Sequence, residues 1–156
     1  MRNFFLALAL LPQVVFAGDI YKTYHNSRFD YSISYPQTTL YPQGESDNQD
    51  GQKFLSKNAD AELIVYGSNN VLEQSLSDLY TEDSRGGTSD SPQKVVTYRT
   101  LKGNWFVVSG HDLGKIFYQK TIFNKGQFKT FIFKYDEKSR KNYDSITAKI
   151  SKSFKG

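Results

Sequence analysis

The side-chain types of a hydrolytic triad occur close together near residue 110. Ser109, His111 and Asp112 supply a nucleophile, a general base and an acid that could orient the base. A triad needs three converging side chains, whereas these lie in and beside one expected turn, where neighbouring side chains diverge. No Gly-x-Ser-x-Gly segment surrounds Ser109. We therefore predict no enzyme and explain Asp112 and the nearby glycines as turn residues; an envelope hydrolase using the three residues is kept as an alternative.

An acidic, turn-rich loop between two glycines, Gly44 and Gly51, offers a different chemistry. Glu45, Asp47 and Asp50 carry the hard oxygen ligands that calcium prefers. Their spacing does not match an EF-hand loop, which requires oxygen ligands at alternate positions, a Gly at the sixth and a Glu at the twelfth. A solvated turn is therefore the default interpretation, and no cofactor is predicted. A metal-binding module using this loop is a second alternative.

Basic residues follow one side of a helix that we expect from about Glu137 to Phe154. Its apolar stripe consists of Tyr143, Ile146, Ile150 and Phe154, and the opposite side carries Lys138, Lys141, Lys149, Lys152 and Lys155. Charge opposite an apolar stripe is normal for a surface helix. However, Lys138, Arg140 and Lys141 lie near the helix start, where positive charge opposes the helix dipole. These residues, with Lys149 and Lys152, are therefore candidates for binding an anionic partner.

Trp105 is the only tryptophan and lies on an expected strand beside Phe106 and Val107. Such a position is usually core or half-buried at a sheet end, although we include Trp105 among the candidate binding residues. Nucleic acid is not an expected partner, because the aromatic residues follow core periodicity instead of alternating with basic residues as in a stacking platform.

Three long strands in succession organise the fold that positions these residues. They are expected at Asn104–Gly110, Lys115–Asn124 and Gln127–Tyr135, separated by short turns that contain Gly and Asn. Apolar side chains occur on both parities, since Ile116 and Tyr118 point one way and Phe117 the other. Alternate residues face opposite sides of a sheet. This sheet therefore needs cover on both faces.

The remaining elements supply further strands and a first helix. Strands are expected at Arg28–Tyr35, Gln52–Lys57, Ala61–Gly67 and Gln93–Leu101. A helix capped by Asn70, with Glu73 at the capping-box position, would carry the stripe Leu72, Leu76, Leu79 and Tyr80. A polar linker from Ser84 to Pro92 follows it. The predicted fold class is α+β: an antiparallel β-sheet covered by helices on both faces, an α/β/α sandwich.

The first 17 residues have the pattern of a secretory signal peptide. Arg2 precedes the apolar run from Phe4 to Leu11, and Ala17 ends a cleavage-site pattern. The run is shorter than the roughly 20 residues that a spanning helix needs. We therefore predict cleavage after Ala17, a flexible lead-in over residues 18–27, one domain over residues 28–156, and a periplasmic or secreted protein without a transmembrane segment. The chain has no cysteine, so its core must hold the fold without disulfides.

The element order and two stretches resemble the Mog1/PsbP-like family, as a small exported bacterial member. The strand Phe29–Pro36 is similar to the opening strand of that family, and Tyr143–Phe154 to its closing helix, which ends in a Ser-Phe pair. The Gln43–Gln52 loop looks like one in small exported bacterial proteins of this type. The resemblance implies a binding or accessory protein and supplies no catalytic residues.

The sequence thus predicts an exported, non-enzymatic binding or accessory protein of the bacterial envelope. Its partner would be a protein or an anionic envelope component. The mild positive charge, which falls from +4 to +3 when Arg2 leaves with the leader, does not identify that partner.

Overall fold

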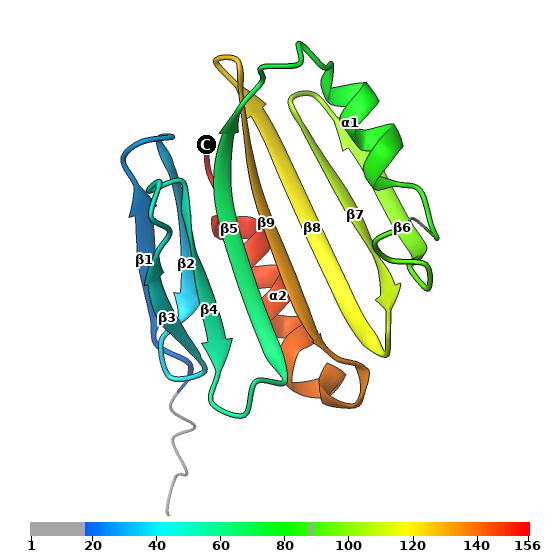
Figure 1. Ribbon diagram of the computed structural model, residues 1–156. Coiled ribbons are helices and arrows are strands. Elements are labelled where there is room, and N and C mark those ends of the chain that lie inside the picture. Colours follow the sequence, from blue (N-terminus) through cyan, green and yellow to red (C-terminus); the bar gives the residue numbers. More distant parts are fainter. Residues whose placement is uncertain (1–17, 88) are drawn as a thin grey trace, which may run out of the picture.

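The computed structural model describes residues 18–87 and 89–156, and the predicted signal peptide lies outside these residues. In the described part, seven antiparallel strands form a sheet in the order β3-β4-β5-β9-β8-β7-β6, and β1 pairs with β2 in a separate hairpin (Figure 1). The strands are β1 (Tyr21–Asn26), β2 (Tyr31–Pro36), β3 (Leu40–Glu45), β4 (Gly51–Ser56), β5 (Ala61–Asn69), β6 (Val95–Lys102), β7 (Trp105–Asp112), β8 (Lys115–Asn124) and β9 (Gln127–Asp136). The helices are α1 (Leu76–Asp83), a 3-10 turn (Glu137–Ser139) and α2 (Arg140–Ser153).

The three central strands form as predicted, and their turns explain why. Leu113 and Gly114 have φ values of +52° and +74°, and Lys125 and Gly126 have +53° and +71°. Two successive residues with positive φ make the tight hairpin turn whose twist matches that of the flanking strands. Strand β7 therefore continues to Asp112, two residues beyond the predicted end at Gly110.

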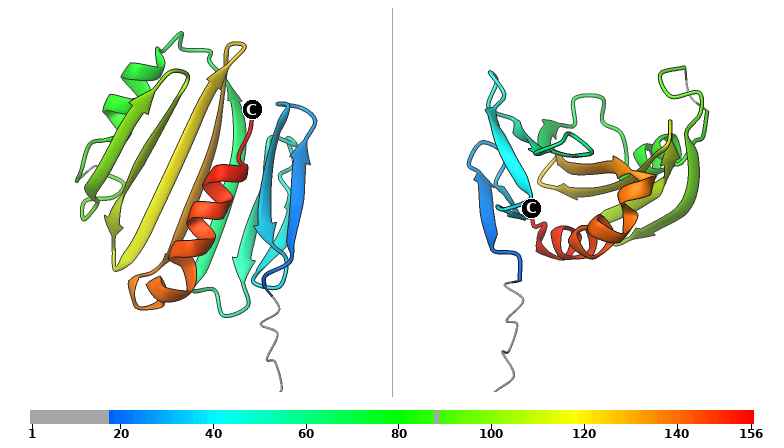
Figure 2. Two further views of the ribbon diagram at one scale, coloured as in Figure 1. Left: turned by 180° about the vertical axis from the view of Figure 1, so that it is seen from behind. Right: turned by 90° about the horizontal axis from the view of Figure 1, so that it is seen from below.

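One face of the sheet, which we call the α2 face, carries α2 and the β1–β2 hairpin side by side (Figure 2). A continuous apolar core lies beneath them, with contributions from Ile33, Tyr35, Leu63, Val65, Phe131, Phe133, Ile146, Ile150 and Phe154. The predicted stripe of α2 is buried in this core. The hairpin corrects one expectation, because six of the residues of the predicted flexible lead-in form strand β1.

The opposite face, the α1 face, has only partial cover. Leu76, Leu79 and Tyr80 of α1 pack on Phe106, Val108 and Phe117, above β7 and β8. No helix lies over the β3–β4–β5 side of this face in the described residues (Figure 1). The antiparallel α+β fold is confirmed, whereas helical cover extends over only part of the α1 face.

The predicted start of the first helix is wrong. The N-cap of α1 is Ser75, whose hydroxyl accepts a hydrogen bond from the Asp78 amide, while the Asp78 carboxylate accepts one from the Ser75 amide. Asn70 instead closes a turn with Gln74. Leu72 consequently lies outside the helix and is 76% exposed.

Candidate functional site

A groove of about 520 Å³ on the α2 face contains two of the predicted binding residues, Arg140 and Lys152. It lies between α2 and strands β7 and β8, because α2 packs over β9 and leaves the neighbouring strands partly bare. Tyr118 and Lys120 rise into it from β8, and Arg140 and Lys152 line it from α2. We call it the basic groove.

Lys120 connects the groove to Trp105 and α2. Its ammonium donates to the main-chain oxygen of Ser151 at 2.9 Å and lies 5.3 Å from the centre of the Trp105 ring. Burial lowers the pKa of Lys120. The cation–π contact links the half-buried Trp105 to the groove. Trp105 also packs against the core, the position expected for it from the sequence.

Arg140 is the one basic residue of the groove with an acidic partner among the described side chains. Its Nε lies 2.9 Å from Oδ2 of Asp144, and the Tyr135 hydroxyl donates to Oδ1 of Asp144 at 2.7 Å. Burial raises the pKa of Asp144, but the hydrogen bonds from Arg140 and Tyr135 outweigh it and the net shift is downward. Arg140 is therefore oriented by a carboxylate that stays ionised.

The other predicted lysines are distributed along α2. Lys149 and Lys152 line a second hollow beside β2, and the Lys149 ammonium lies 5.3 Å from the Tyr21 ring. Lys138 lies 3.8 Å from a carboxylate oxygen of Asp136, and Lys141 is exposed. Among the described residues, none of Lys120, Lys141, Lys149 and Lys152 forms an ion pair with an acidic side chain. The α2 face thus presents uncompensated positive charge.

The residues of the possible triad do not converge. All three belong to strand β7, in which alternate residues face opposite sides, so Ser109 and His111 lie on the α2 face and Asp112 lies on the α1 face. The Ser109 hydroxyl donates to the main-chain oxygen of Phe117 at 2.8 Å, and Nδ1 of His111 lies 3.7 Å from Glu137. A base oriented by Asp112 is therefore not available to Ser109.

Two of the three carboxylates of the acidic loop accept hydrogen bonds from nearby side chains, while Asp47 is exposed. Asp50 accepts from Ser46 at 2.6 Å and from Asn48 at 2.8 Å, and Glu45 accepts from the Tyr24 hydroxyl at 2.7 Å. Within residues 18–87 and 89–156, no three acidic, histidine or cysteine side chains are grouped as a metal site requires. The donors to these two carboxylates come from the loop itself and from β1.

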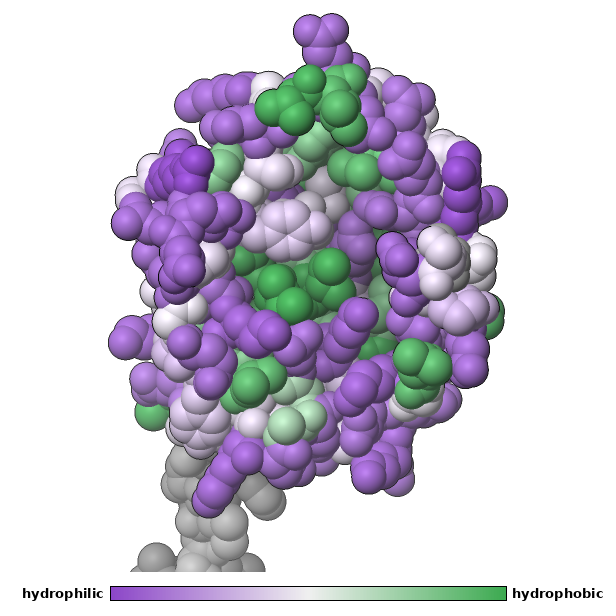
Figure 3. Space-filling model, viewed as in Figure 1, coloured by the Kyte–Doolittle hydropathy of each residue, from purple (hydrophilic) through white to green (hydrophobic). Residues whose placement is uncertain are grey.

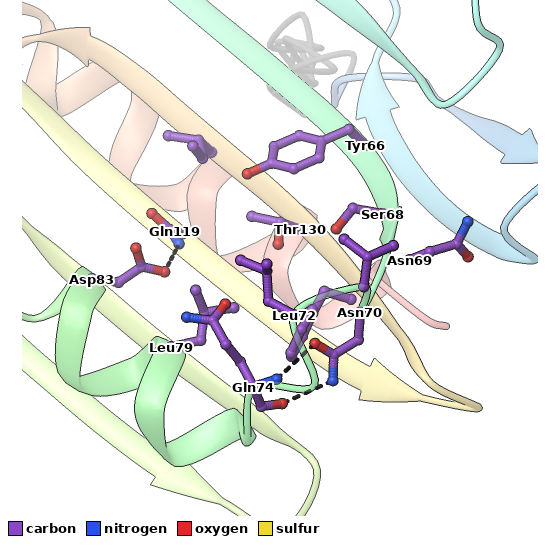
Figure 4. A pocket seen from close by; sticks show the side chains of 13 residues that line it. Tyr66, Ser68, Asn69, Asn70, Leu72, Gln74, Leu79, Asp83, Gln119 and Thr130 are labelled. Carbon is purple, nitrogen blue, oxygen red and sulfur yellow. Dashed lines mark hydrogen bonds between the residues drawn. The ribbon is translucent and has the colours of Figure 1, made fainter.

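A pocket of about 380 Å³ on the α1 face was not predicted. Figure 3 shows apolar side chains exposed near the centre of this face, within a mostly hydrophilic surround. Tyr66 and Thr130 line the sheet side of the pocket, Leu79 and Asp83 come from α1, and Leu72 comes from the β5–α1 connection (Figure 4). The sequence indicates this pocket only through polar residues at alternate positions of β5, β8 and β9. These residues can be recognised as neighbours on one face only once the register of the three strands is known.

A solved structure has a similar arrangement of strands and helices. The solution structure of cyanobacterial PsbP (CyanoP) from Synechocystis sp. PCC 6803 superimposes with a TM-score of 0.68, over 95% of this chain and 98% of that chain, at 16% sequence identity. The chain has a PsbP-like fold. No family model matches the sequence, and neither does any curated protein. The predicted resemblance to PsbP is confirmed for the fold, while the likeness to Mog1 stays a prediction.

In this chain the basic groove and the α1-face pocket lie on opposite faces of the one sheet. At this level of identity the PsbP-like fold fixes the arrangement of the strands and helices and assigns no role to a side chain. No helix in the described residues has the length and apolarity that crossing a bilayer requires.

Proposed function

We propose that the protein is an exported, non-enzymatic binding or accessory protein of the bacterial envelope. It holds an anionic partner, a protein or an envelope component, on the basic groove and the exposed lysines of α2. The PsbP-like fold supports the binding or accessory role that the resemblance implied. Export rests on the leader pattern of residues 1–17.

The observation that carries the proposal is the charge left unpaired beside a groove. Lys120 and Lys152 line the groove without an acidic partner in the described residues, and Lys141 and Lys149 extend the positive surface along α2. Exposed lysines elsewhere would serve solubility alone, whereas a concave site with an excess of one charge concentrates the opposite charge. In this groove Lys120, Arg140 and Lys152 outnumber the single carboxylate of Asp144. No contact in the described residues favours the hydrolase or the metal-binding module over this proposal.

The test compares two variants that change net charge equally. The first is Lys141→Glu, Lys149→Glu and Lys152→Glu, all exposed on α2. The second is Lys57→Glu, Arg99→Glu and Lys125→Glu, which are exposed, form no ion pair among the described residues and do not line the groove. The chain from Gly18, tagged at one end, is used to capture proteins and acidic polysaccharide from an envelope extract. Captured components are quantified by mass spectrometry and sugar analysis at low and at 0.5 M salt.

We expect a component that the wild type and the second variant retain and that the first variant loses. Binding should weaken in high salt, because exposed charges are screened over a few ångströms at such ionic strength. Equal capture by both variants would assign binding to another surface, and capture of nothing by the wild type would contradict the proposal.

A further inference from the structure

The pocket on the α1 face takes no part in the proposed anion binding, and it has features of a built site. Its volume of about 380 Å³ lies in the range of small-molecule sites. Its walls combine apolar side chains, Leu79 and Ile132 among them, with the hydroxyl of Tyr66 and the amide of Gln119. In Figure 4, the Tyr66 hydroxyl points across the pocket toward the side on which Gln119 and Asp83 lie.

The rim of this pocket is a turn held by side-chain hydrogen bonds. Asn70 accepts from the Gln74 amide at 2.9 Å and donates to the Gln74 carbonyl at 2.8 Å, and Glu73 has φ of +52°. Positive φ is costly for a residue with a side chain. This turn holds Val71 and Leu72 in solvent, 81% and 76% exposed, where both also line the pocket. Two exposed apolar side chains fixed at a pocket mouth are suited to cover an apolar ligand.

The inner end of the pocket carries a carboxylate without an ion pair. Oδ2 of Asp83 accepts from Nε2 of Gln119 at 2.6 Å. The nearby Lys94 ammonium donates at 2.8 Å to the main-chain oxygen of Asp83 and faces the Phe117 ring. Among the described residues, no basic group lies within ion-pair distance of the Asp83 carboxylate, and Oδ1 accepts no hydrogen bond. Burial raises the pKa of Asp83, against the opposing effects of Gln119 and Lys94. Asp83 therefore lines the pocket with one carboxylate oxygen free to accept a hydrogen bond.

We propose that this pocket binds a small apolar amine. The ammonium donates a hydrogen bond to Asp83 beside Gln119, and the apolar body lies against Leu79 and Ile132 beneath the Val71–Leu72 rim. A carboxylate in a partly buried site favours a cation over a neutral or anionic head group, because charge-assisted hydrogen bonds are the stronger ones. The inference does not depend on the proposed function, since it concerns the opposite face of the sheet.

The test uses three probes that share one apolar body and differ in the head group: n-hexylamine, n-hexanol and hexanoate. Each is titrated into the chain from Gly18 while amide and side-chain NH₂ signals, including that of Gln119, are followed by NMR. We expect hexylamine to bind about tenfold more tightly than hexanol, the ratio that a charge-assisted hydrogen bond supplies. Hexanoate should bind most weakly.

Two variants and a control locate the effect. Asp83→Asn should remove the preference for the amine, whereas Asp90→Asn, an equal charge change at an exposed site outside the pocket, should keep it. Leu72→Ser, at an exposed position that leaves the core intact, should weaken hexylamine and hexanol by the same factor. If Asp83→Asn does not fold, the head-group series and Leu72→Ser decide the matter. Equal binding of amine and alcohol, retained preference in Asp83→Asn, or unsaturable shifts spread over acidic side chains would overturn the proposal.

Discussion

Asp60 shows how one side chain can join elements that are far apart in the sequence. It lies in the β4–β5 turn, and its carboxylate accepts hydrogen bonds from Tyr143 at 2.6 Å and from Ser56 and Ser139 at 2.8 Å. Burial raises the pKa of Asp60, but the hydroxyl donors outweigh it and the net shift is downward. Burial and the neighbouring Asp60 raise the pKa of Tyr143 to about 12. In the sequence Asp60 only falls between the expected strands Gln52–Lys57 and Ala61–Gly67, and nothing local indicates a partner 83 positions away.

Replacing Asp60 by Ala should therefore destabilise the fold. We expect a loss of about 2–3 kcal/mol in the free energy of unfolding at pH 7, because three hydroxyl groups lose an ionised acceptor. Urea unfolding measures this loss, with Asp47→Ala, in the exposed loop, as the control. A loss no larger than that of Asp47→Ala would contradict the role assigned to the carboxylate.

The same variant should lose its disadvantage in acid. A carboxyl whose folded pKa is lower than its unfolded value of about 3.9 stabilises the fold fully above that pH. The contribution disappears as the pH falls through the folded pKa. The difference between wild type and Asp60→Ala should thus be constant from pH 7 to about pH 5 and shrink below pH 4.

At the scale of elements, the start of α1 shows where sequence patterns become ambiguous. Asn70 and Glu73 match a capping box as well as Ser75 and Asp78 do, and the apolar residue Leu72 favoured the earlier start. The structure uses the second pair, because Glu73 has a positive φ that no helix accommodates. The existence of the helix and the packing role of Leu76, Leu79 and Tyr80 were predictable. Its boundary depended on which of two similar local motifs the tertiary fold selects.

Removing the true cap should loosen α1 and leave the rest of the sheet intact. Ser75→Ala should cost about 1 kcal/mol of helix stability, because the Asp78 amide loses its acceptor. Amide hydrogen exchange in α1 should then accelerate about fivefold. Asn70→Ala serves as the control, since it opens the rim turn without touching the cap, and it should leave exchange within α1 unchanged. Equal acceleration in both variants would show that the rim turn, not the cap, limits opening of the helix.

Gly110 gives a second case in which an element differs from its local pattern. A glycine next to His111 and Asp112 favours a turn, but Gly110 lies inside β7, opposite Val96. A Cβ at this position would lie 1.9 Å from the main-chain oxygen of Val95, at the point where the β6–β7 register shifts. Glycine inside a strand also marks a close backbone approach, which becomes decidable only with the pairing known.

Gly110→Ala should consequently separate β6 from β7. We expect a loss of at least about 2 kcal/mol, because the obstructing oxygen and carbon of Val95 are backbone atoms and cannot rotate away. Chemical denaturation measures the loss, and Gly18→Ala, where no atom lies within 4 Å of the added carbon, is the control. Unchanged stability in Gly110→Ala would mean that β6 can shift at little cost.

At the scale of the whole molecule, the central pairing joins the two halves of the chain. Strand β5, residues 61–69, pairs over its full length with β9, residues 127–135, so the sheet is completed only when the last strand arrives. Apolar residues on both parities predicted that both faces need cover. They could not predict that the β1–β2 hairpin shares the α2 face, because β1 is polar and carries no amphipathic signal. Likewise, the lysines of α2 were visible in the sequence. The position of Lys120 beside Trp105 required the register of β7 and β8, and the pocket on the α1 face required that of β5, β8 and β9.

The closing helix should be indispensable to this architecture. Tyr143, Ile146, Ile150 and Phe154 are each at most 5% exposed and cover the aromatic side chains of β9. Burying one such side chain contributes about 1.5–3 kcal/mol, so the four together are comparable with the roughly 5–15 kcal/mol that holds a domain folded. Without the helix, Phe131 and Phe133 would also face water.

A chain from Gly18 that ends at Asp136 should therefore lack a cooperative unfolding transition, and its near-ultraviolet circular dichroism should be lost while some strand signal remains. It should also bind the dye ANS, as compact states with exposed apolar surface do. A chain that starts at Tyr21 and keeps α2 is the control, because it removes only the exposed residues 18–20, and it should unfold like the full domain. A sharp transition in the chain ending at Asp136 would show that the hairpin and sheet fold without the helix, which would leave α2 free to move with a bound partner.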